Sequence, residues 1–241
     1  MRLFSFQDQQ GHHSLGALFE KDSSQYIDLC ATDPNIPKDL LALIQSDPEL
    51  TQARRALLNP QAVIHNLSDI RFTPLIHRPQ KIICLGLNYA DHAKEGGHAR
   101  PDYPSFFMRG PSSLTAHQAP IIRPKASTKL DYEAELAFVM GKRAKHCSLE
   151  NALEHVVGYS IFNDGSVRDY QRKSTQWTIG KNFDQTGAFG PWLVTPDELP
   201  VGASGLQIQS RLNGQLMQNA NTKDFLWGVA ETIVLITECM T

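Results

Sequence analysis

The chain of 241 residues has few cysteines, few aromatic residues and no long hydrophobic run. Its four cysteines, Cys30, Cys84, Cys147 and Cys239, are scattered without a paired spacing, which argues against a disulfide framework and against a zinc knuckle. No stretch approaches the ~20 apolar residues that a membrane-spanning helix needs. The first residues turn polar before the apolar core of a signal peptide could form. We therefore expect reduced thiols, no membrane partner and a cytoplasmic location.

An excess of charge of either sign is also missing. Lys and Arg total 23 against 25 Asp and Glu, which gives a formal net charge of -2. Proteins that bind nucleic acids present a basic surface to the phosphate backbone, so we expect no nucleic-acid partner. Hydrophobic residues make up 41% of the chain and charged residues 20%, a composition typical of a folded protein with a sizeable core.

Several common catalytic motifs are absent. The chain contains no Gly-x-Gly-x-x-Gly after a strand, and Gly141-Lys142-Arg143 lacks the earlier glycine and the hydroxyl group of a phosphate-binding loop. It also contains neither Gly-x-Ser-x-Gly nor His-Glu-x-x-His. These absences disfavour nucleotide binding through the common motifs, and they disfavour the serine hydrolase and zinc protease templates.

The patterns that are present divide the chain in two. Residues 1–76 predict a small N-terminal α+β domain, and residues 77–80 contain a proline that favours an extended boundary segment. Residues 77–241 predict a mostly β domain with peripheral helices, because the strand candidates come at mixed spacing with few helices between them. The predicted strands lie at 3–6, 15–19, 26–29, 81–87, 105–108, 121–122, 133–140, 157–162 and 192–194, and the predicted helices at 38–44, 50–58, 88–95 and 151–155.

The strongest local signal is the pair Glu133 and Glu135 in the strand predicted at 133–140. Side chains alternate between the two faces of a strand, so both carboxylates lie on one face while Leu136 and Phe138 lie on the other. Repulsion between the two carboxylates must be relieved by water or by a cation. An exposed strand face is the simpler interpretation of such a pair on its own.

Asp164 adds a third carboxylate at the end of another apolar strand. Three carboxylates from two strands, without His or Cys, form an oxygen site suited to Mg²⁺ or Mn²⁺ rather than to zinc. Such a site would leave positions open for water or for a bidentate oxyacid. The alternative is that Asp164 caps the turn that follows it.

Two further groups of residues are candidates for catalysis. On a helix, His92 and Glu95 lie one turn apart, so Glu95 could fix the tautomer of His92 and raise its basicity, which outlines a general-base dyad. An exposed His/Glu pair is the alternative.

Lys181 lies in an apolar context, with Arg168 and Gln171 shortly after Asp164. A lysine beside a metal can stabilise an enolate or bind a carboxylate, whereas a surface lysine is the alternative.

Taken together and in order, these motifs resemble those of the fumarylacetoacetate hydrolase family, in particular its bacterial acylpyruvase and hydroxymuconate isomerase-like members. The matching patterns are Gly-x-Asn-Tyr-x-x-His-x-x-Glu from Gly86, Glu-x-Glu from Glu133, Asn-Asp-x-Ser-x-Arg-Asp from Asn163 and Gly-Lys-x-x-Asp from Gly180. The resemblance runs from about Lys81 through Val194.

The resemblance implies a role for each candidate residue. It implies Mg²⁺, or Mn²⁺, bound by Glu133, Glu135 and Asp164. It implies catalysis by Lys181 and by a water-activating dyad on a mobile lid, and substrate contacts from two residues near the metal. The dyad is His92 with Glu95, and the substrate-binding residues are Arg168 and Gln171.

The resemblance also implies a β-barrel-like body of rolled sheets, usually in a homodimer. The expected enzyme is a divalent-metal-dependent hydrolase that cleaves a C–C bond in a small 2,4-dioxo acid, of the acylpyruvate or fumarylpyruvate type, through a metal-bound enolate. Within the same family the alternatives are a decarboxylase of oxaloacetate-type acids and an isomerase of hydroxymuconate-type diacids or of 2-hydroxyhepta-2,4-diene-1,7-dioate.

Members of the family continue with further strands beyond the apolar helical pattern at 231–241. We therefore expect a C-terminally incomplete catalytic domain, and a non-catalytic remnant is a further alternative.

Overall fold

The computed structural model describes residues 1–20, 23–89 and 102–241. In this part of the chain, ten strands form one sheet along the path β4-β3-β2-β1-β14-β11-β13-β8, with β10 paired to β11 and β5 paired to β1. The fold is mixed α+β and dominated by strands, as the sequence predicts. The strands of the sheet are β1 Arg2–Gln7, β2 His13–Leu18, β3 Gln25–Asp28, β4 Ile64–Asn66, β5 Arg71–Phe72, β8 Leu114–Thr115, β10 Ala134–Met140, β11 Val156–Asp164, β13 Gly187–Phe189 and β14 Leu193–Val194.

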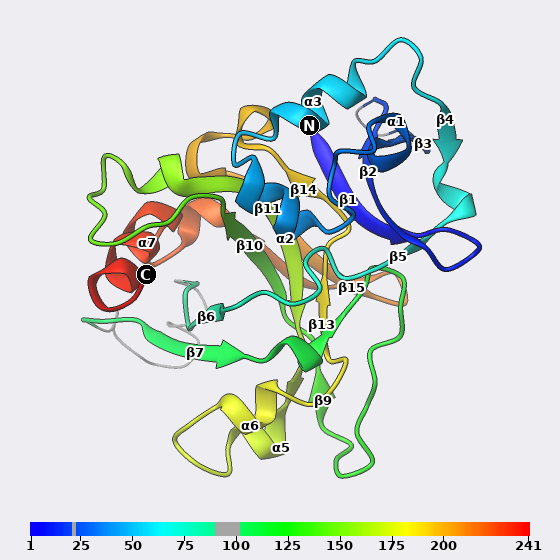
Figure 1. Ribbon diagram of the computed structural model, residues 1–241. Coiled ribbons are helices and arrows are strands. Elements are labelled where there is room, and N and C mark those ends of the chain that lie inside the picture. The colour runs from blue at the N-terminus through cyan, green and yellow to red at the C-terminus, as the bar shows by residue number, and fades with distance from the viewer. Residues whose placement is uncertain (21–22, 90–101) are drawn as a thin grey trace.

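Smaller elements surround this sheet (Figure 1). Three two-stranded sheets are β6 Ile82–Gly86 with β7 Ser105–Arg109, β9 Leu130–Asp131 with β12 Ser166–Val167, and β15 Gln207–Leu212 with β16 Gln215–Asn221. The α-helices are α1 Leu29–Thr32, α2 Leu40–Ser46, α3 Thr51–Leu57, α5 Arg168–Gln171, α6 Thr178–Lys181 and α7 Val229–Cys239. The 3₁₀ turns are η1 Leu67–Asp69, η2 Pro111–Ser113, η3 Ala152–His155, η4 Pro196–Glu198, η5 Val201–Ala203 and η6 Thr222–Asp224.

The N-terminal strands and the later strands belong to the same sheet. Strand β1 pairs with β2 on one side, and it pairs antiparallel with β14, where Leu3 lies opposite Leu193. Leu3, Leu15 and Leu193 are completely buried in one hydrophobic cluster, which also contains Phe189. The two predicted parts of the chain therefore share a sheet and a core. The division at residues 76 and 77 stays a prediction.

Most predicted elements correspond to observed ones, and two do not. The strand predicted at 121–122 is wrong, because Pro120 and Pro124 flank these residues and have no N–H for a strand ladder. The backbone N–H of Ile122 instead makes a single bond to the carbonyl oxygen of Gln185. The helix predicted at 88–95 is wrong at its start, since Tyr89 forms an isolated β-bridge with Phe225. Its remaining residues lie outside the described part of the chain.

Strand β10 is covered on both faces. Ala137 and Val139 pack against the large hydrophobic cluster of the sheet. Leu136 and Phe138 pack against a second cluster that includes Ile233 of α7. The predicted alternation of β10 is therefore confirmed, and Glu135 projects on the same face as Ala137.

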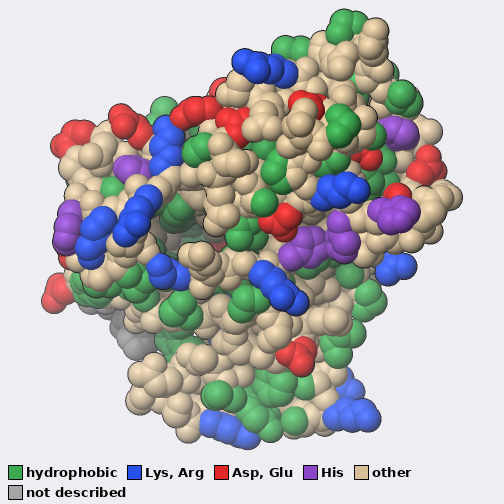
Figure 2. Space-filling model, in the orientation of Figure 1, with side chains coloured by type: hydrophobic (Ala, Val, Ile, Leu, Met, Phe, Trp, Pro, Cys, Tyr) green, Lys and Arg blue, Asp and Glu red, His purple; other side chains and the backbone are tan. Residues whose placement is uncertain are grey.

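The face shown in Figure 2 has no strong preference for one sign of charge. On the face in Figure 2, basic and acidic side chains are interspersed, in keeping with the nearly balanced formal charge of the chain. Among the described helices, none has the length and apolar character needed to cross a membrane.

Candidate active site

Two adjacent strands bring the carboxylates of Glu133 and Asp164 together. Asp164 is the last residue of β11, and Glu133 immediately precedes β10. The strands pair antiparallel, with Ala134 opposite Asn163. The backbone N–H of Asp164 donates to the carbonyl oxygen of Glu133 at 2.9 Å, and the backbone N–H of Glu133 donates to Oδ1 of Asn163 at 3.1 Å. The local backbone therefore fixes Glu133 beside Asp164.

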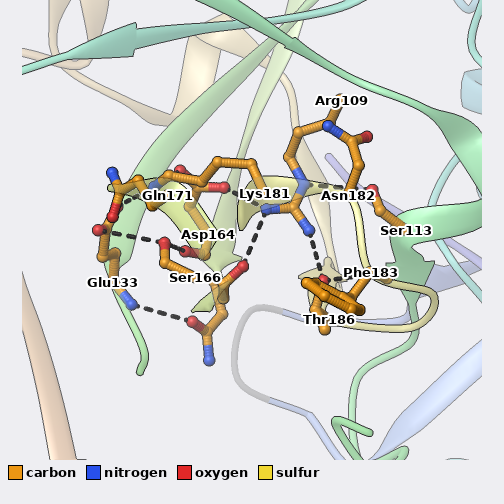
Figure 3. A network of polar contacts seen from close by, with 12 residues as sticks. Arg109, Ser113, Glu133, Asp164, Ser166, Gln171, Lys181, Asn182, Phe183 and Thr186 are labelled. Carbon is orange, nitrogen blue, oxygen red and sulfur yellow. Dashed lines mark hydrogen bonds and ion pairs between the residues drawn. The ribbon is translucent and has the colours of Figure 1, made fainter. Parts of the chain in front are cut away.

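Lys181, the last residue of α6, lies between these carboxylates (Figure 3). Its ammonium nitrogen Nζ is 2.8 Å from Oε2 of Glu133 and 2.6 Å from Oδ2 of Asp164. The same nitrogen lies 5.0 Å from the centre of the Phe107 ring, within the range of a cation–π contact. Lys181 is buried at 2% exposure, so the surface-lysine alternative is wrong.

Arg168 and Gln171, at the two ends of the short helix α5, lie beside the same cluster. Nη1 of Arg168 is 2.5 Å from Oε1 of Glu133, and Nε donates to Oδ2 of Asp131 at 2.8 Å. Nη1 also donates to Oε1 of Gln171 at 3.0 Å. Burial raises the pKa of Glu133, but the charges of Lys181 and Arg168 outweigh burial and hold this pKa below its ordinary value.

Arg109, which our sequence analysis missed, is a second basic residue that contacts Asp164. It is the last residue of β7 and is buried. Its Nη1 lies 2.5 Å from Oδ1 of Asp164. A positive charge in an apolar strand is buried only when it is paired. The run Phe106-Phe107-Met108-Arg109 was therefore a signal in the sequence.

Glu135 has the weakest compensation by positive charge among the three candidate carboxylates. Burial, followed by repulsion from Glu133 and Asp164, raises the pKa of Glu135 to about 8, although Lys181 and a hydrogen bond with the Tyr89 side chain oppose this shift. Glu135 and Asp164 both line a cavity of about 770 Å³. The walls of this cavity include apolar residues of β6, β10 and α7.

The three predicted metal ligands match a divalent cation in their chemistry. All are carboxylates, the donors that Mg²⁺ and Mn²⁺ prefer, and burial followed by repulsion from Glu133 and Asp164 raises the pKa of Glu135. In the arrangement seen for residues 1–20, 23–89 and 102–241, no three His, Cys, Asp or Glu side chains are grouped closely enough to hold a metal ion. The Lys181 ammonium lies between the oxygens of Glu133 and Asp164. Metal binding at this site stays a prediction.

The predicted dyad, His92 and Glu95, lies outside the described residues. The start of its motif is anchored next to the site. The Asn88 side chain exchanges two hydrogen bonds with the backbone of Trp227, at 2.9 and 3.1 Å, and the ring of Tyr89 packs edge-on against Phe225 at 4.9 Å between centroids. The motif therefore begins at the segment that leads into α7.

Comparisons with known proteins match most or all of the chain. The family described as fumarylacetoacetate (FAA) hydrolase C-terminal matches residues 81–241. The chain is 36% identical over 243 residues to the mitochondrial oxaloacetate tautomerase fahd2 of Xenopus laevis, covering 100% of this chain and 76% of that protein. It is 35% identical over 218 residues to the human mitochondrial oxaloacetate tautomerase FAHD2A, covering 89% of this chain and 69% of that protein.

Solved structures of related enzymes also superpose on the chain. A fumarylacetoacetate hydrolase from Exiguobacterium antarcticum superposes with a TM-score of 0.83 at 31% identity, covering 100% of this chain and 82% of its own. The maleylpyruvate hydrolase of Sphingobium sp. SYK-6, in complex with manganese(II) and pyruvate, superposes with a TM-score of 0.80 at 26% identity, covering 100% of this chain and 84% of its own. From its motifs, its fold and these relatives, the chain belongs to the fumarylacetoacetate hydrolase family of enzymes.

Proposed function

We propose that this chain is a divalent-metal-dependent enzyme that enolises a small 2-oxo diacid of the oxaloacetate class. The observation that carries this proposal is the buried Lys181 ammonium, which contacts Glu133 and Asp164 next to the cavity. Removing a proton from the carbon beside a ketone leaves negative charge on the carbonyl oxygen, and a fixed cation in a buried site stabilises that charge. The relatives named as oxaloacetate tautomerases, which match the chain at 36% and 35% identity, support this choice of substrate class.

The two basic residues Lys181 and Arg168 would bind different parts of such a substrate. Lys181 would hold the oxygen that becomes the enolate. Arg168 is partly exposed, and its planar guanidinium would bind a substrate carboxylate in exchange for one of its present contacts with Asp131 and Glu133. The side-chain oxygen of Gln171 accepts a hydrogen bond from Arg168 and limits the rotation of the Arg168 guanidinium.

The three acidic residues would be the metal ligands. Glu133, Glu135 and Asp164 would hold it, and a divalent cation bound there would polarise the 2-oxo group as a Lewis acid. In tautomerisation a proton leaves the carbon between the ketone and the distal carboxylate, and a proton is added to the ketone oxygen. The proton acceptor that we propose is His92, oriented by Glu95, as the sequence predicts.

Hydrolysis of a C–C bond in a 2,4-dioxo acid is the second candidate. The structural similarity to a maleylpyruvate hydrolase with bound manganese and pyruvate favours it. For that reaction, His92 would deprotonate a water molecule that attacks the distal carbonyl carbon. The C–C bond would then break, and its electrons would form the pyruvate enolate beside Lys181. The two candidates differ in their products, because only hydrolysis releases pyruvate together with a carboxylic acid.

Parallel assays with Mn²⁺ test both candidates. The first follows the ultraviolet absorbance of the oxaloacetate enol, and the second measures the pyruvate formed from an acylpyruvate. We expect enolisation that is abolished by a chelator and by Lys181→Met, but retained in Lys223→Met, which alters an exposed lysine. Pyruvate from the acylpyruvate without enolisation would favour hydrolysis, and pyruvate from oxaloacetate itself would indicate decarboxylation. Inactivity of the metal-loaded protein in both assays would contradict both candidates.

A further inference from the structure

We propose that Arg109 is a positioning residue that holds Asp164 in the orientation needed to bind a divalent cation. This inference rests on the proposed function, because it assumes that Asp164 is a metal ligand. Arg109 lies at the end of β7 and Asp164 at the end of β11, so two separate sheets meet at this ion pair. The Arg109 side chain is 0% exposed and the Asp164 side chain 6% exposed.

The guanidinium of Arg109 donates to hydrogen-bond acceptors on both of its sides. Besides Oδ1 of Asp164, Nη1 donates to the carbonyl oxygen of Gly165 at 3.1 Å. Nη2 donates to Oγ1 of Thr186 at 2.9 Å, and Nε donates to Oγ of Ser113 at 3.2 Å (Figure 3). Because these acceptors come from separate parts of the chain, the guanidinium plane has a fixed orientation.

Tight packing prevents the guanidinium from moving. The Phe162 ring centre is 5.4 Å from the central carbon of Arg109. A Cβ atom at Gly187 would lie 2.8 Å from Nη2 of Arg109 and 2.7 Å from the Phe162 ring, which is closer than real Cβ contacts allow. A larger residue at position 187 would therefore have to displace the Phe162 ring or the Arg109 guanidinium.

The two oxygens of Asp164 have different partners. Oδ1 contacts Arg109, whereas Oδ2 contacts Lys181 at 2.6 Å. Among the described residues around the cavity, Asp164 lines the wall and Arg109 does not. Because the Arg109 side chain is 0% exposed and its three guanidinium nitrogens all donate to protein oxygens, we place it behind Asp164, where it orients the carboxylate without contacting a substrate.

Orientation and charge can be separated by experiment. A lysine keeps the positive charge of Arg109 but has one nitrogen, which cannot reach Asp164, Thr186 and Ser113 together. Residues that orient a metal ligand typically change metal affinity by about 10–100-fold when they are replaced. The Arg109→Lys variant therefore isolates the effect of geometry.

The test measures Mn²⁺ affinity from the electron paramagnetic resonance signal of free Mn²⁺, well below the unfolding temperature of each variant. We expect Arg109→Lys to raise the Kd for Mn²⁺ by about 10-fold or more. Thr186→Val alters no charge and removes one acceptor of the guanidinium, so it should raise the Kd in the same direction. The control is Arg54→Lys, because Arg54 pairs with Asp197 at the surface, with N–O distances of 3.3 Å.

The outcomes separate this inference from the proposed function. Wild-type affinity in folded Arg109→Lys would overturn the positioning role alone. A fall in the unfolding temperature without a change in Kd would do the same, since it indicates a purely structural role. If Arg109→Lys does not fold, Thr186→Val decides by the same criteria. Wild-type protein that binds no Mn²⁺ would overturn the proposed function, and this inference with it.

Discussion

The ammonium nitrogen of Lys181 lies 2.6 Å from Oδ2 of Asp164, where the two side chains are only 3% and 6% exposed. Removing Lys181 would leave Arg109 as the remaining cation that contacts the buried Asp164 among the described residues, and weaker compensation of a buried charge costs more than the loss of a surface ion pair. Lys181 therefore serves the stability of the metal-free protein as well as the proposed chemistry.

Replacement of Lys181 by methionine should destabilise the metal-free protein by about 3 kcal/mol, because Glu133 and Asp164 lose the cation between them. Added Mn²⁺ should recover part of this loss, since a divalent cation compensates the same carboxylates. Denaturant unfolding with and without Mn²⁺ measures both effects, with Lys223→Met as the control. Equal stability of Lys181→Met and wild type would show that the pair contributes nothing net.

Without metal, the buried Glu135 should make stability depend on pH. Its pKa is raised from the ordinary value of 4.5 to about 8. Between these values the unfolded chain has released the proton and the folded chain keeps it, so rising pH disfavours the folded state. The contribution of this group is at most about 1.4 kcal/mol per pH unit.

The measurement is the free energy of unfolding at several pH values for wild type and Glu135→Gln. Other titrating groups cancel in the difference between the two proteins. We expect wild type to lose stability relative to Glu135→Gln as pH rises from 4.5 to about 8. Parallel pH curves would contradict an elevated pKa at Glu135.

Gly180→Ala should displace Lys181. A Cβ atom at Gly180 would lie 2.4 Å from the backbone nitrogen of Gln171 and 2.5 Å from its Cα, so α6 must move away from α5. Overpacking of this kind costs about 1–3 kcal/mol, and we expect a loss of activity larger than the loss of stability explains. Gly228→Ala is the matched control, because its Cβ would meet no atom closer than 3.8 Å. An active Gly180→Ala enzyme would show that the position of Lys181 tolerates this shift.

Mn²⁺ and oxalate should stabilise the protein together more than the sum of their separate effects. Oxalate resembles the enolate of pyruvate, and a ligand at 100 times its Kd adds about 2.7 kcal/mol to the free energy of unfolding. Thermal unfolding with neither, either or both ligands measures this coupling, which should disappear in Glu135→Gln. Additive or absent shifts in wild type would mean that the two ligands do not share this site.

The sequence predicted residues that form local motifs better than residues that act at a distance. Glu133, Asp164 and Lys181 were found because each lies in a recognisable motif, and the structure brings their side chains into contact. Arg109 was missed because its role depends on Asp164, which follows 55 positions later. That contact exists only because strands β7 and β11 end at the same place. His92, Glu95, the choice between Mg²⁺ and Mn²⁺ and the homodimer stay predictions.

One missed element had a clear local signal. The hairpin of β15 and β16 turns at Asn213 and Gly214, whose φ angles are 51° and 82°. An Asn-Gly pair adopts these positive angles readily and is the strongest short-range indication of a hairpin. In contrast, the strand predicted from Ile121 and Ile122 relied on β-branched residues alone, and the flanking prolines decided the outcome.

The pairing of β1 with β14 has a consequence for the order of folding. Strand β1 can pair with β2 early, because the two are joined by a short turn, but its partner β14 is synthesised much later, since Leu193 follows its partner Leu3 by 190 positions. Contacts between distant parts of a chain form slowly, because a long loop must close first. During synthesis, β5 can pair with the Phe6–Gln7 end of this edge, but the Arg2–Leu3 end stays unpaired until β14 has left the ribosome, and this part of the edge is open to mispairing in the nascent chain.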